Sequence, residues 1–260
     1  MRDHPLLLVV WARYFGQMVV VTPFALHRGG WGFWRTRRLP LQLVRSALLL
    51  AATIAFFGAL RYLPLAEASA VSYLAPVVAV ALSWRVLRER ATPARIAASA
   101  VSFAGILVVV RPGSAILHPA VLLLLVTAVC NGLYALYTRK LRDESAHATL
   151  FYTALVGAVG LTLALPFLLE STSLGWRDVA LLVATGVFAG LGHGLLTTAY
   201  ARAPATLLAP FTYLQIVWAT IFGYVIFGQH PDRWSALGMA TIIASGVLLA
   251  LWERRRLTVA

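Results

Sequence analysis

Long apolar runs, separated by short polar or basic connections, dominate the sequence. Nine runs are each roughly 17–25 residues long, the length that an α-helix needs to cross about 30 Å of hydrocarbon. None shows the strict alternation of apolar and polar residues that is typical of a membrane β-strand, so we expect helices. The predicted spans are residues 5–26, 41–60, 65–87, 94–110, 117–138, 148–169, 176–200, 205–227 and 234–252. The pattern predicts an all-α, polytopic transmembrane helix bundle with nine spans.

The composition supports a membrane protein and excludes several other classes. Of the 260 residues, 60% are hydrophobic and 12% are charged, whereas a soluble domain carries about 25% charged residues. A soluble enzyme is therefore excluded. The single cysteine, Cys130, excludes a disulfide scaffold, and its apolar surroundings favour a role in helix packing.

The basic charge fits a membrane topology better than nucleic-acid binding. The chain has 22 Lys and Arg against nine Asp and Glu, and the cations cluster between the apolar runs. One set of connections carries fifteen of them, at positions 28, 35, 37, 38, 85, 88, 90, 95, 139, 140, 142, 202 and 254–256. The alternate set carries five, at positions 2, 61, 111, 177 and 233. The positive-inside rule then places the C-terminus in the cytoplasm and the N-terminus outside, in a multi-pass protein of the inner (plasma) membrane.

A faint internal repeat has an offset of 140 residues. It aligns Pro64 with Pro204 and Tyr73-Leu74 with Tyr213-Leu214. Five predicted spans separate the two prolines, and an odd number inverts the second copy relative to the membrane. We therefore expect two inverted repeats, with four of five helices in residues 1–113 and five helices in residues 114–260.

The same offset predicts a helix upstream of the chain. The second repeat begins with the span at 117–138, and its equivalent in the first repeat would precede Met1. We expect that the chain starts one helix late, through a truncated gene model or a genuine loss. The alternative is a natural nine-helix protein with its N-terminus outside.

Several segments resemble the EamA-type branch of the drug/metabolite transporter superfamily. They are the stretch LRYLPLAEASAVSYLAP at 60–76, RER at 88–90, AGILVVVRPG at 104–113, APA at 203–205 and APFTY at 209–213. The resemblance implies ten helices in two inverted five-helix repeats, both termini in the cytoplasm, and transport of metabolites. Within that branch the chain is most similar to bacterial carriers of riboflavin or S-adenosylmethionine. It departs from the pattern by lacking the first helix.

Arg13 is the first candidate for contacting a substrate. It lies near the middle of the first span, one helical turn before Gln17 on the same face. An arginine at mid-bilayer costs roughly 2.5–3.5 kcal/mol on insertion, so it should face a cavity or a partner. It either holds an anionic or zwitterionic group of the substrate or bonds neighbouring helices together. The family resemblance favours the second role.

Two further helices carry polar residues on one face. Thr127, Asn131, Tyr134 and Thr138 form a stripe that either lines a cavity or bonds to other helices. His193 shares a face with Gly186 and Gly190, whose small size lets another helix come close. His193 either carries a coupling proton or is a hydrogen-bonded packing residue.

The remaining candidates are a carboxylate and a set of ring contacts. Glu67, near the start of the third span, either binds a proton or is a solvated helix cap. Tyr73, Tyr213, Gln215 and Trp218 are candidates for contacting a flat heterocycle.

Missing motifs narrow the function. The sequence has no Walker loop, no metal-ligand spacing and no hydrolase motif, so we expect neither an enzyme nor a bound cofactor. We predict a secondary transporter of a small amino-acid-, nucleoside- or flavin-like metabolite that works by alternating access. Its partners would be the metabolite and the lipid bilayer, without nucleic acid, and a homodimer is possible. The alternatives are a non-transporting scaffold or sensor module and an inactive truncated carrier.

Overall fold

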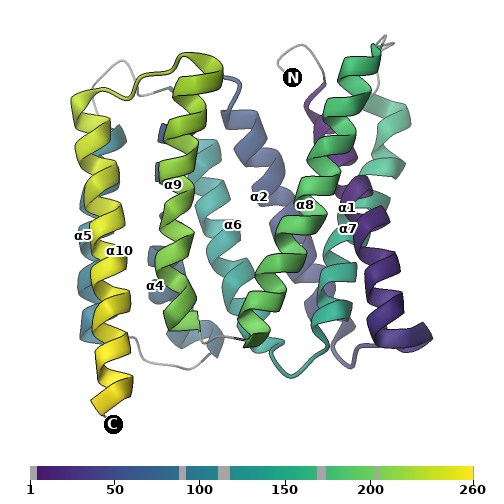
Figure 1. The fold of residues 1–260 in the computed structure, drawn as a ribbon, viewed down its shortest axis with the longest axis horizontal. Coiled ribbons are helices and arrows are strands. Elements are labelled where there is room, and N and C mark those ends of the chain that lie inside the picture. The colour runs from purple at the N-terminus through teal and green to yellow at the C-terminus, as the bar shows by residue number, and fades with distance from the viewer. Residues whose placement is uncertain (1–4, 88–91, 111–117, 169–173, 203–204, 260) are drawn as a thin grey trace. The chain divides into compact units, whose positions relative to one another are not determined.

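The computed structural model describes residues 5–87, 92–110, 118–168, 174–202 and 205–259 of the chain (Figure 1). These residues form helices joined by short turns, and none of them belongs to a β-strand. The elements are α1 (Leu6–Gly29), η1 (Gly30–Gly32), α2 (Leu39–Ala59), α3 (Leu65–Ser72), α4 (Ala75–Leu87), α5 (Pro93–Val110), α6 (Val121–Lys140), α7 (Ala146–Leu168), α8 (Trp176–Arg202), α9 (Ala205–Phe227) and α10 (Arg233–Val259). The predicted all-α class is confirmed.

The helices have the length and composition of membrane spans. Within the described residues, seven are long and apolar enough to cross a bilayer, with α3 and the start of α4 treated as one. Two shorter apolar helices, Pro93–Val109 and Gln215–Phe227, match the other two predicted runs. The chain is therefore a polytopic helical membrane protein, and the count of nine spans stays a prediction. The motif residues 88–90, 111–113 and 203–204 lie outside the described part of the chain.

The third predicted run contains a break that the apolar pattern did not predict. Residues 65–87 form α3 and α4, with Tyr73 and Leu74 in a turn between them. The amide of Leu74 donates to the Val71 carbonyl at 3.0 Å. This bond joins residues three positions apart, so it closes a tighter turn than the α-helical bond between residues four apart. Pro76 contributes to the break, because proline lacks an N–H and its ring crowds the carbonyl of the residue four positions earlier, but Pro23 and Pro210 lie inside the unbroken helices α1 and α9.

The 140-residue offset of the sequence repeat is present in the helix starts. Leu6 of α1 and Ala146 of α7, Leu65 of α3 and Ala205 of α9, and Pro93 of α5 and Arg233 of α10 are each 140 residues apart. The two helices of each pair also pack against each other. The helix order therefore repeats with the period of the weak sequence match, although the boundary between the repeats stays a prediction.

The chain divides into two compact units. Unit 1 is Met1–Phe57 with Tyr137–Ala199, and unit 2 is Gly58–Leu136 with Tyr200–Ala260. Unit 1 thus contains α1, most of α2, α7 and most of α8. Unit 2 contains α3, α4, α5, most of α6, α9 and α10. Each unit therefore combines helices from both predicted repeats.

Small residues let the helices of unit 2 pack closely. A Cβ on Gly105 of α5 would lie 2.9 Å from the carbonyl oxygen of Gly238 on α10, well inside van der Waals contact. The hydroxyls of Ser102 and Ser245, which are both buried, hydrogen-bond between the same two helices. In Figure 1, α5 and α10 run side by side along their length.

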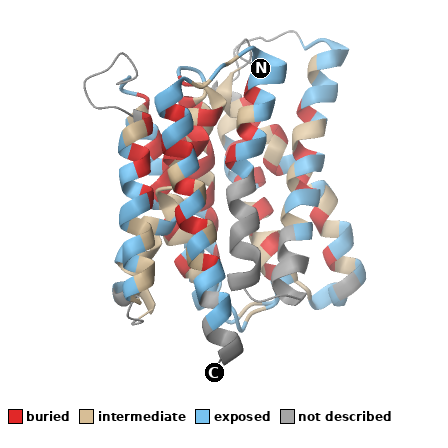
Figure 2. Ribbon diagram, turned by 60° about the vertical axis from the view of Figure 1, so that its left-hand side comes forward, coloured by how far each residue is buried: buried red, intermediate tan, exposed pale blue. Residues whose placement is uncertain are grey.

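The exposed surface of the helices is apolar. Figure 2 shows buried positions along the sides of helices and exposed positions on other sides of the same helices. Many exposed positions carry large hydrophobic side chains, among them Leu122, Leu163, Phe188, Leu195 and Val225. A water-soluble fold would place polar side chains there, whereas a lipid-facing surface is apolar.

Candidate functional site

A hydrogen bond joins two of the predicted site residues, Arg13 and His193, inside unit 1. The Nη2 atom of Arg13 lies 3.3 Å from Nε2 of His193, although the residues are 180 positions apart. Since a guanidinium always donates, Nε2 of His193 accepts, and the proton of this neutral ring is on Nδ1. The Arg13 guanidinium also lies over the ring of Tyr14, 5.1 Å from its centroid.

An open cleft of about 390 Å³ lies beside this pair. The lining residues are Arg13, Phe57, Thr185, Phe188, Ala189, Gly192 and His193. The five residues from α8 follow helical spacing, because positions three, four, seven and eight after Thr185 fall on the same face. The cleft thus has a cationic, hydrogen-bonding end and a largely apolar wall, and all its residues belong to unit 1.

Glycines bring α1 and α8 close enough to build the cleft. A Cβ on Gly186 would lie 2.5 Å from Cα of Gly16 and 2.8 Å from the carbonyl oxygen of Ala12. One turn along, a Cβ on Gly190 would lie 2.9 Å from Cβ of Val20. The predicted close approach at Gly186 and Gly190 is confirmed, and its partner is the helix that carries Arg13.

Buried polar atoms of unit 1 have unmet hydrogen-bonding capacity. Gln17 is fully buried, and neither its amide oxygen nor its amide nitrogen has a hydrogen-bond partner among the described residues. Three further buried atoms also lack a hydrogen-bond partner among the described residues: Nη1 of Arg13, Oε1 of Gln42 and Oγ of Ser46. Leaving such a group unpaired costs about 1–3 kcal/mol, and more for a charged group. Sites of this kind favour a polar ligand or water.

A second buried arginine, Arg45 on α2, was missed by the sequence analysis. It is 2% exposed. Its Nε donates to Oγ1 of Thr138 at 2.7 Å, and its Nη1 donates to the carbonyl of Thr149 at 3.2 Å and to Oγ1 of Thr153 at 2.9 Å. Gln42 Nε2 donates to Oγ1 of Thr149 at 3.1 Å. These bonds tie α2 to α7 and to the end of α6.

The polar residues of α2 that make these contacts, here called the polar seam, are regularly spaced in the sequence. Positions 42, 45, 46 and 53 fall on one face of α2, at the spacing used to recognise the stripe on α6. Thr53 at the end of this face accepts or donates a hydrogen bond of 3.0 Å with the hydroxyl of Tyr14. The seam connects α2 to α1 as well, and it holds the helix that carries Arg13.

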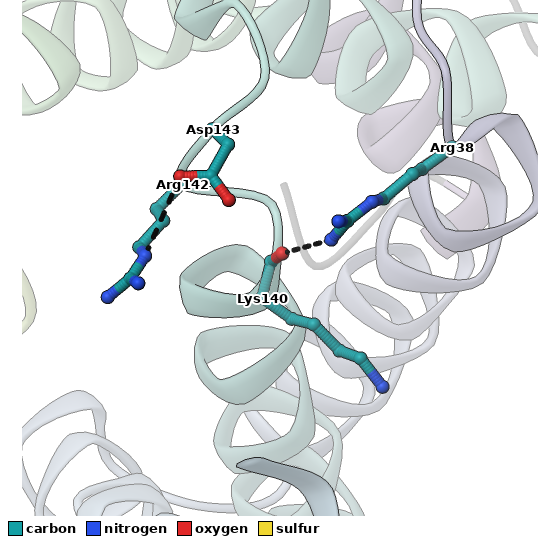
Figure 3. A network of polar contacts seen from close by, with 4 residues as sticks. All are labelled: Arg38, Lys140, Arg142 and Asp143. Carbon is teal, nitrogen blue, oxygen red and sulfur yellow. Dashed lines mark hydrogen bonds and ion pairs between the residues drawn. The ribbon is translucent and has the colours of Figure 1, made fainter.

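Other arginines of unit 1 lie in exposed connections. Figure 3 shows Arg38 donating from Nη1 to the carbonyl of Lys140 at 3.0 Å and Arg142 beside Asp143 at 3.7 Å. The Arg142 side chain is 73% exposed. Contacts of this kind contribute little to stability, and the positions match a basic, solvent-facing loop.

The ring candidates lie in unit 2 and are only partly assembled. The hydroxyl of Tyr73, in the turn between α3 and α4, donates to Oε1 of Gln215 on α9 at 3.2 Å. Trp218 is 54% exposed and stacks on Phe222. The side chain of Tyr213 lies outside the described residues. The role of these residues in ligand binding stays a prediction.

The stripe on α6 lies on the less exposed side of its helix. Thr127 is buried and donates to the carbonyl of Leu123 within the same helix, at 2.9 Å. Asn131 and Tyr134 are half-buried, whereas Leu122 on another face is 65% exposed. The stripe therefore lies on the side of α6 that packs against other helices. The binding of a ligand by Asn131 and Tyr134 stays a prediction.

Glu67 lies where two helix N-termini meet in unit 2. It belongs to the first turn of α3, and its Oε1 accepts from the hydroxyl of Ser235 in the first turn of α10 at 3.3 Å. Asp232 accepts from the Ser235 amide at 2.8 Å as a cap of α10. Helix N-termini stabilise a carboxylate, so this geometry supports a charged cap at Glu67.

The chain matches known proteins over most of its length. The model of the EamA-like transporter family matches residues 1–111 and 118–251. An uncharacterized transporter of Helicobacter pylori is 30% identical over 222 residues, which cover 83% of this chain and 74% of the relative. One solved structure superposes with a TM-score of 0.74 at 22% identity and covers 97% of this chain and 90% of its own, which shows a shared fold.

Two groups of relatives are named as transporters of different metabolites. An S-adenosylmethionine uptake transporter of Rickettsia prowazekii is 27% identical and covers 96% of this chain and 84% of its own length. A riboflavin transporter of Brucella anthropi is 27% identical and covers 94% of this chain and 88% of its own. These relatives are transporters and not enzymes. The apolar helices, the family match over almost the whole chain and the named relatives agree that the chain is a membrane transport protein of the EamA-like transporter family.

Proposed function

We propose that the protein is a secondary transporter that moves a small organic metabolite across the inner membrane by alternating access. The substrate would bind in the unit 1 cleft at Arg13 and His193. These residues come from α1 and α8, which belong to different predicted repeats. Secondary transporters commonly bind their substrates with helices from both repeats, and the two helices here pack within one compact unit.

The observation that carries this proposal is the unmet hydrogen-bonding capacity of Arg13, which lines the cleft, and of Gln17, one helical turn further along α1. Nη1 of Arg13 and both amide atoms of Gln17 are buried without partners among the described residues. Each such group lowers stability unless a ligand or water pairs it, so a bound polar substrate would be stabilised here. By contrast, Arg45 in the same unit has hydrogen-bond partners for both its Nε and its Nη1 atoms.

The relatives support a small metabolite with a ring system. S-adenosylmethionine and riboflavin are the compounds in their names. Amino-acid-, nucleoside- and flavin-like substrates are all consistent with that pair. Glu67 and His193 are the candidates for binding a coupling proton.

The test is uptake by purified protein in proteoliposomes. The vesicles would be incubated with a defined mixture of amino acids, nucleosides, S-adenosylmethionine and riboflavin, and their contents measured by mass spectrometry. We expect at least one compound to accumulate above the level in protein-free liposomes. Folded, correctly inserted protein that moves none of them would contradict transport and favour a scaffold or an inactive carrier.

A further inference from the structure

We propose that the substrate carries a carboxylate, bound by Arg13, next to a compact apolar or aromatic group. This inference rests on the proposed function and deepens it. It selects amino-acid-like compounds with a small apolar or aromatic side chain over carboxylate-free flavins and nucleosides. The argument has three parts: the placement of charge in unit 1, the hydrogen bonds of Arg13, and the lining of the cleft.

The helices of unit 1 supply no internal carboxylate to neutralise Arg13. The guanidinium belongs to the eighth residue of α1, well inside the span. Asp143 and Glu144 lie in the connection after α6, and Asp178 lies in the first turn of α8, where it accepts from the Gly175 amide. By sequence, Asp3 precedes α1 and Glu170 follows α7. An arginine inside a membrane span requires a compensating partner, and an anionic substrate would supply it.

One of the two terminal nitrogens of the Arg13 guanidinium has no hydrogen-bond partner among the described residues and could bind a carboxylate. Nη2 donates to His193, and Nη1 is buried without a partner among the described residues. His193 is neutral in this arrangement because its Nε2 accepts, so the positive charge of the pair belongs to Arg13. A planar guanidinium matches the geometry of a carboxylate, and hydrogen bonds between charged groups are about twice as strong as neutral ones.

The rest of the cleft suits an apolar body of small size. Phe57 and Phe188 contribute rings, Ala189 and Gly192 leave space, and Thr185 contributes a hydroxyl. The volume of about 390 Å³ lies near the lower end of the range for small-molecule sites. A carboxylate at one end and an apolar or aromatic group at the other would match this division.

The test compares compounds that differ in the carboxylate alone. The pairs are phenylalanine and phenethylamine, tryptophan and tryptamine, and S-adenosylmethionine and its decarboxylated form, with riboflavin as a carboxylate-free ring. Accumulation in proteoliposomes measures transport, and thermal stabilisation of the detergent-purified protein measures binding without transport. We expect at least one carboxylate to bind at least about tenfold more tightly than its decarboxylated partner, because a charged hydrogen bond is lost.

Variants test whether Arg13 is the group that recognises the carboxylate. Arg13→Gln should weaken binding of that compound about 10- to 100-fold, and Arg13→Lys should weaken it less because the charge remains. Arg142→Gln, which removes an exposed arginine, is the matched control and should leave binding unchanged. If Arg13→Gln fails to fold, discrimination between the paired compounds by the unmodified protein still decides the question.

The outcomes separate this inference from the proposed function. Binding of a carboxylate without uptake would support the inference and overturn transport. Uptake of riboflavin or of the decarboxylated amines as readily as the carboxylates would support transport and overturn the inference. Folded protein that neither binds nor moves any member of the panel would overturn both.

Discussion

Two arginines lie inside the helices of unit 1, and their surroundings differ. Arg45 donates three hydrogen bonds to α7 and the end of α6. Arg13 makes one bond to His193, borders an open cleft and keeps Nη1 buried without a partner among the described residues. This difference is the reason for proposing that Arg45 stabilises the helix bundle and that Arg13 binds the ligand.

This difference predicts opposite effects of two substitutions. Arg45→Leu breaks three charge-assisted hydrogen bonds and should lower the free energy of unfolding by about 2–3 kcal/mol, with a lower Tm in detergent. Arg13→Gln should lose ligand binding while its Tm changes much less, because it breaks one bond. Fluorescence-detected size exclusion after heating measures both. Equal losses of Tm for the two variants would show that Arg13 is structural too.

The residues of the candidate site were easier to recognise in the sequence than their contacts with one another. Arg13, Gln17 and His193 were all recognised, since a charge or amide within an apolar run is conspicuous. The contact between Arg13 and His193 spans 180 positions and depends on helix packing, which no local pattern encodes. Arg45 was missed, although the polar spacing on its helix would have identified it.

At the level of elements, close packing of α1 on α8 depends on a glycine pair. A Cβ on Gly186 would lie 2.5 Å from Cα of Gly16, and the obstacle is backbone that cannot rotate away. Helix association in lipid depends on such close contact, because no hydrophobic effect drives it there. The cleft residues on α8 are therefore positioned by the glycine face on the same helix.

Gly186→Leu should separate α1 from α8. We expect a clear loss of folded, monodisperse protein, or a Tm several degrees lower in the protein that remains. Gly160→Ala on α7 is the matched control, because a Cβ there meets nothing within 4 Å and alanine favours a helix. Size-exclusion profiles in detergent would compare the two. Normal folding of Gly186→Leu would contradict the proposed packing.

The elements themselves were largely predictable from apolar run length. Each predicted run corresponds to helical residues, and their ends differ by a few positions. The exception is the break between α3 and α4 beside Pro76, which was not predictable from proline alone because Pro23 and Pro210 lie inside unbroken helices. Run length measures how much apolar sequence is available, and it is insensitive to one missing backbone donor.

At the scale of the whole molecule, the repeat implies an inverted topology. Helix starts recur at an offset of 140 residues, and the expected inversion places equivalent connections on opposite sides of the membrane. Arg37, between α1 and α2, and Arg177, at the start of α8, are both exposed and are 140 residues apart. They provide a matched pair for testing the inversion.

The pair can be tested with single cysteines in a Cys130→Ala background. We predict that a membrane-impermeant thiol reagent added to intact cells labels Arg177→Cys but labels Arg37→Cys only after the membrane is permeabilised. The basic connections on the side of Arg37 are the reason, by the positive-inside rule. Labelling of both positions in intact cells would contradict the inverted repeat, and labelling of Arg37→Cys alone would reverse the orientation.

The equivalent helices of the two repeats and the family could be predicted from sequence, whereas the composition of the compact units could not. Unit 1 combines α1 and α2 with α7 and α8, so each predicted repeat is divided between the two units. A weak 140-residue match identifies equivalent helices but does not specify which helices pack together. Which helices pack together depends on small residues such as Gly16 and Gly186. In the sequence, such a residue indicates a close helix contact but does not identify the partner helix.

The most direct test of the whole account is counterflow in proteoliposomes. Vesicles loaded with an unlabelled compound that the protein accumulates would be diluted into a trace of the same labelled compound. A carrier that alternates between two openings should take up the label several-fold faster than unloaded vesicles do, and Arg13→Gln should abolish the acceleration. Uptake that is indifferent to the internal compound, or acceleration that survives in Arg13→Gln, would contradict an alternating-access carrier with its site at Arg13.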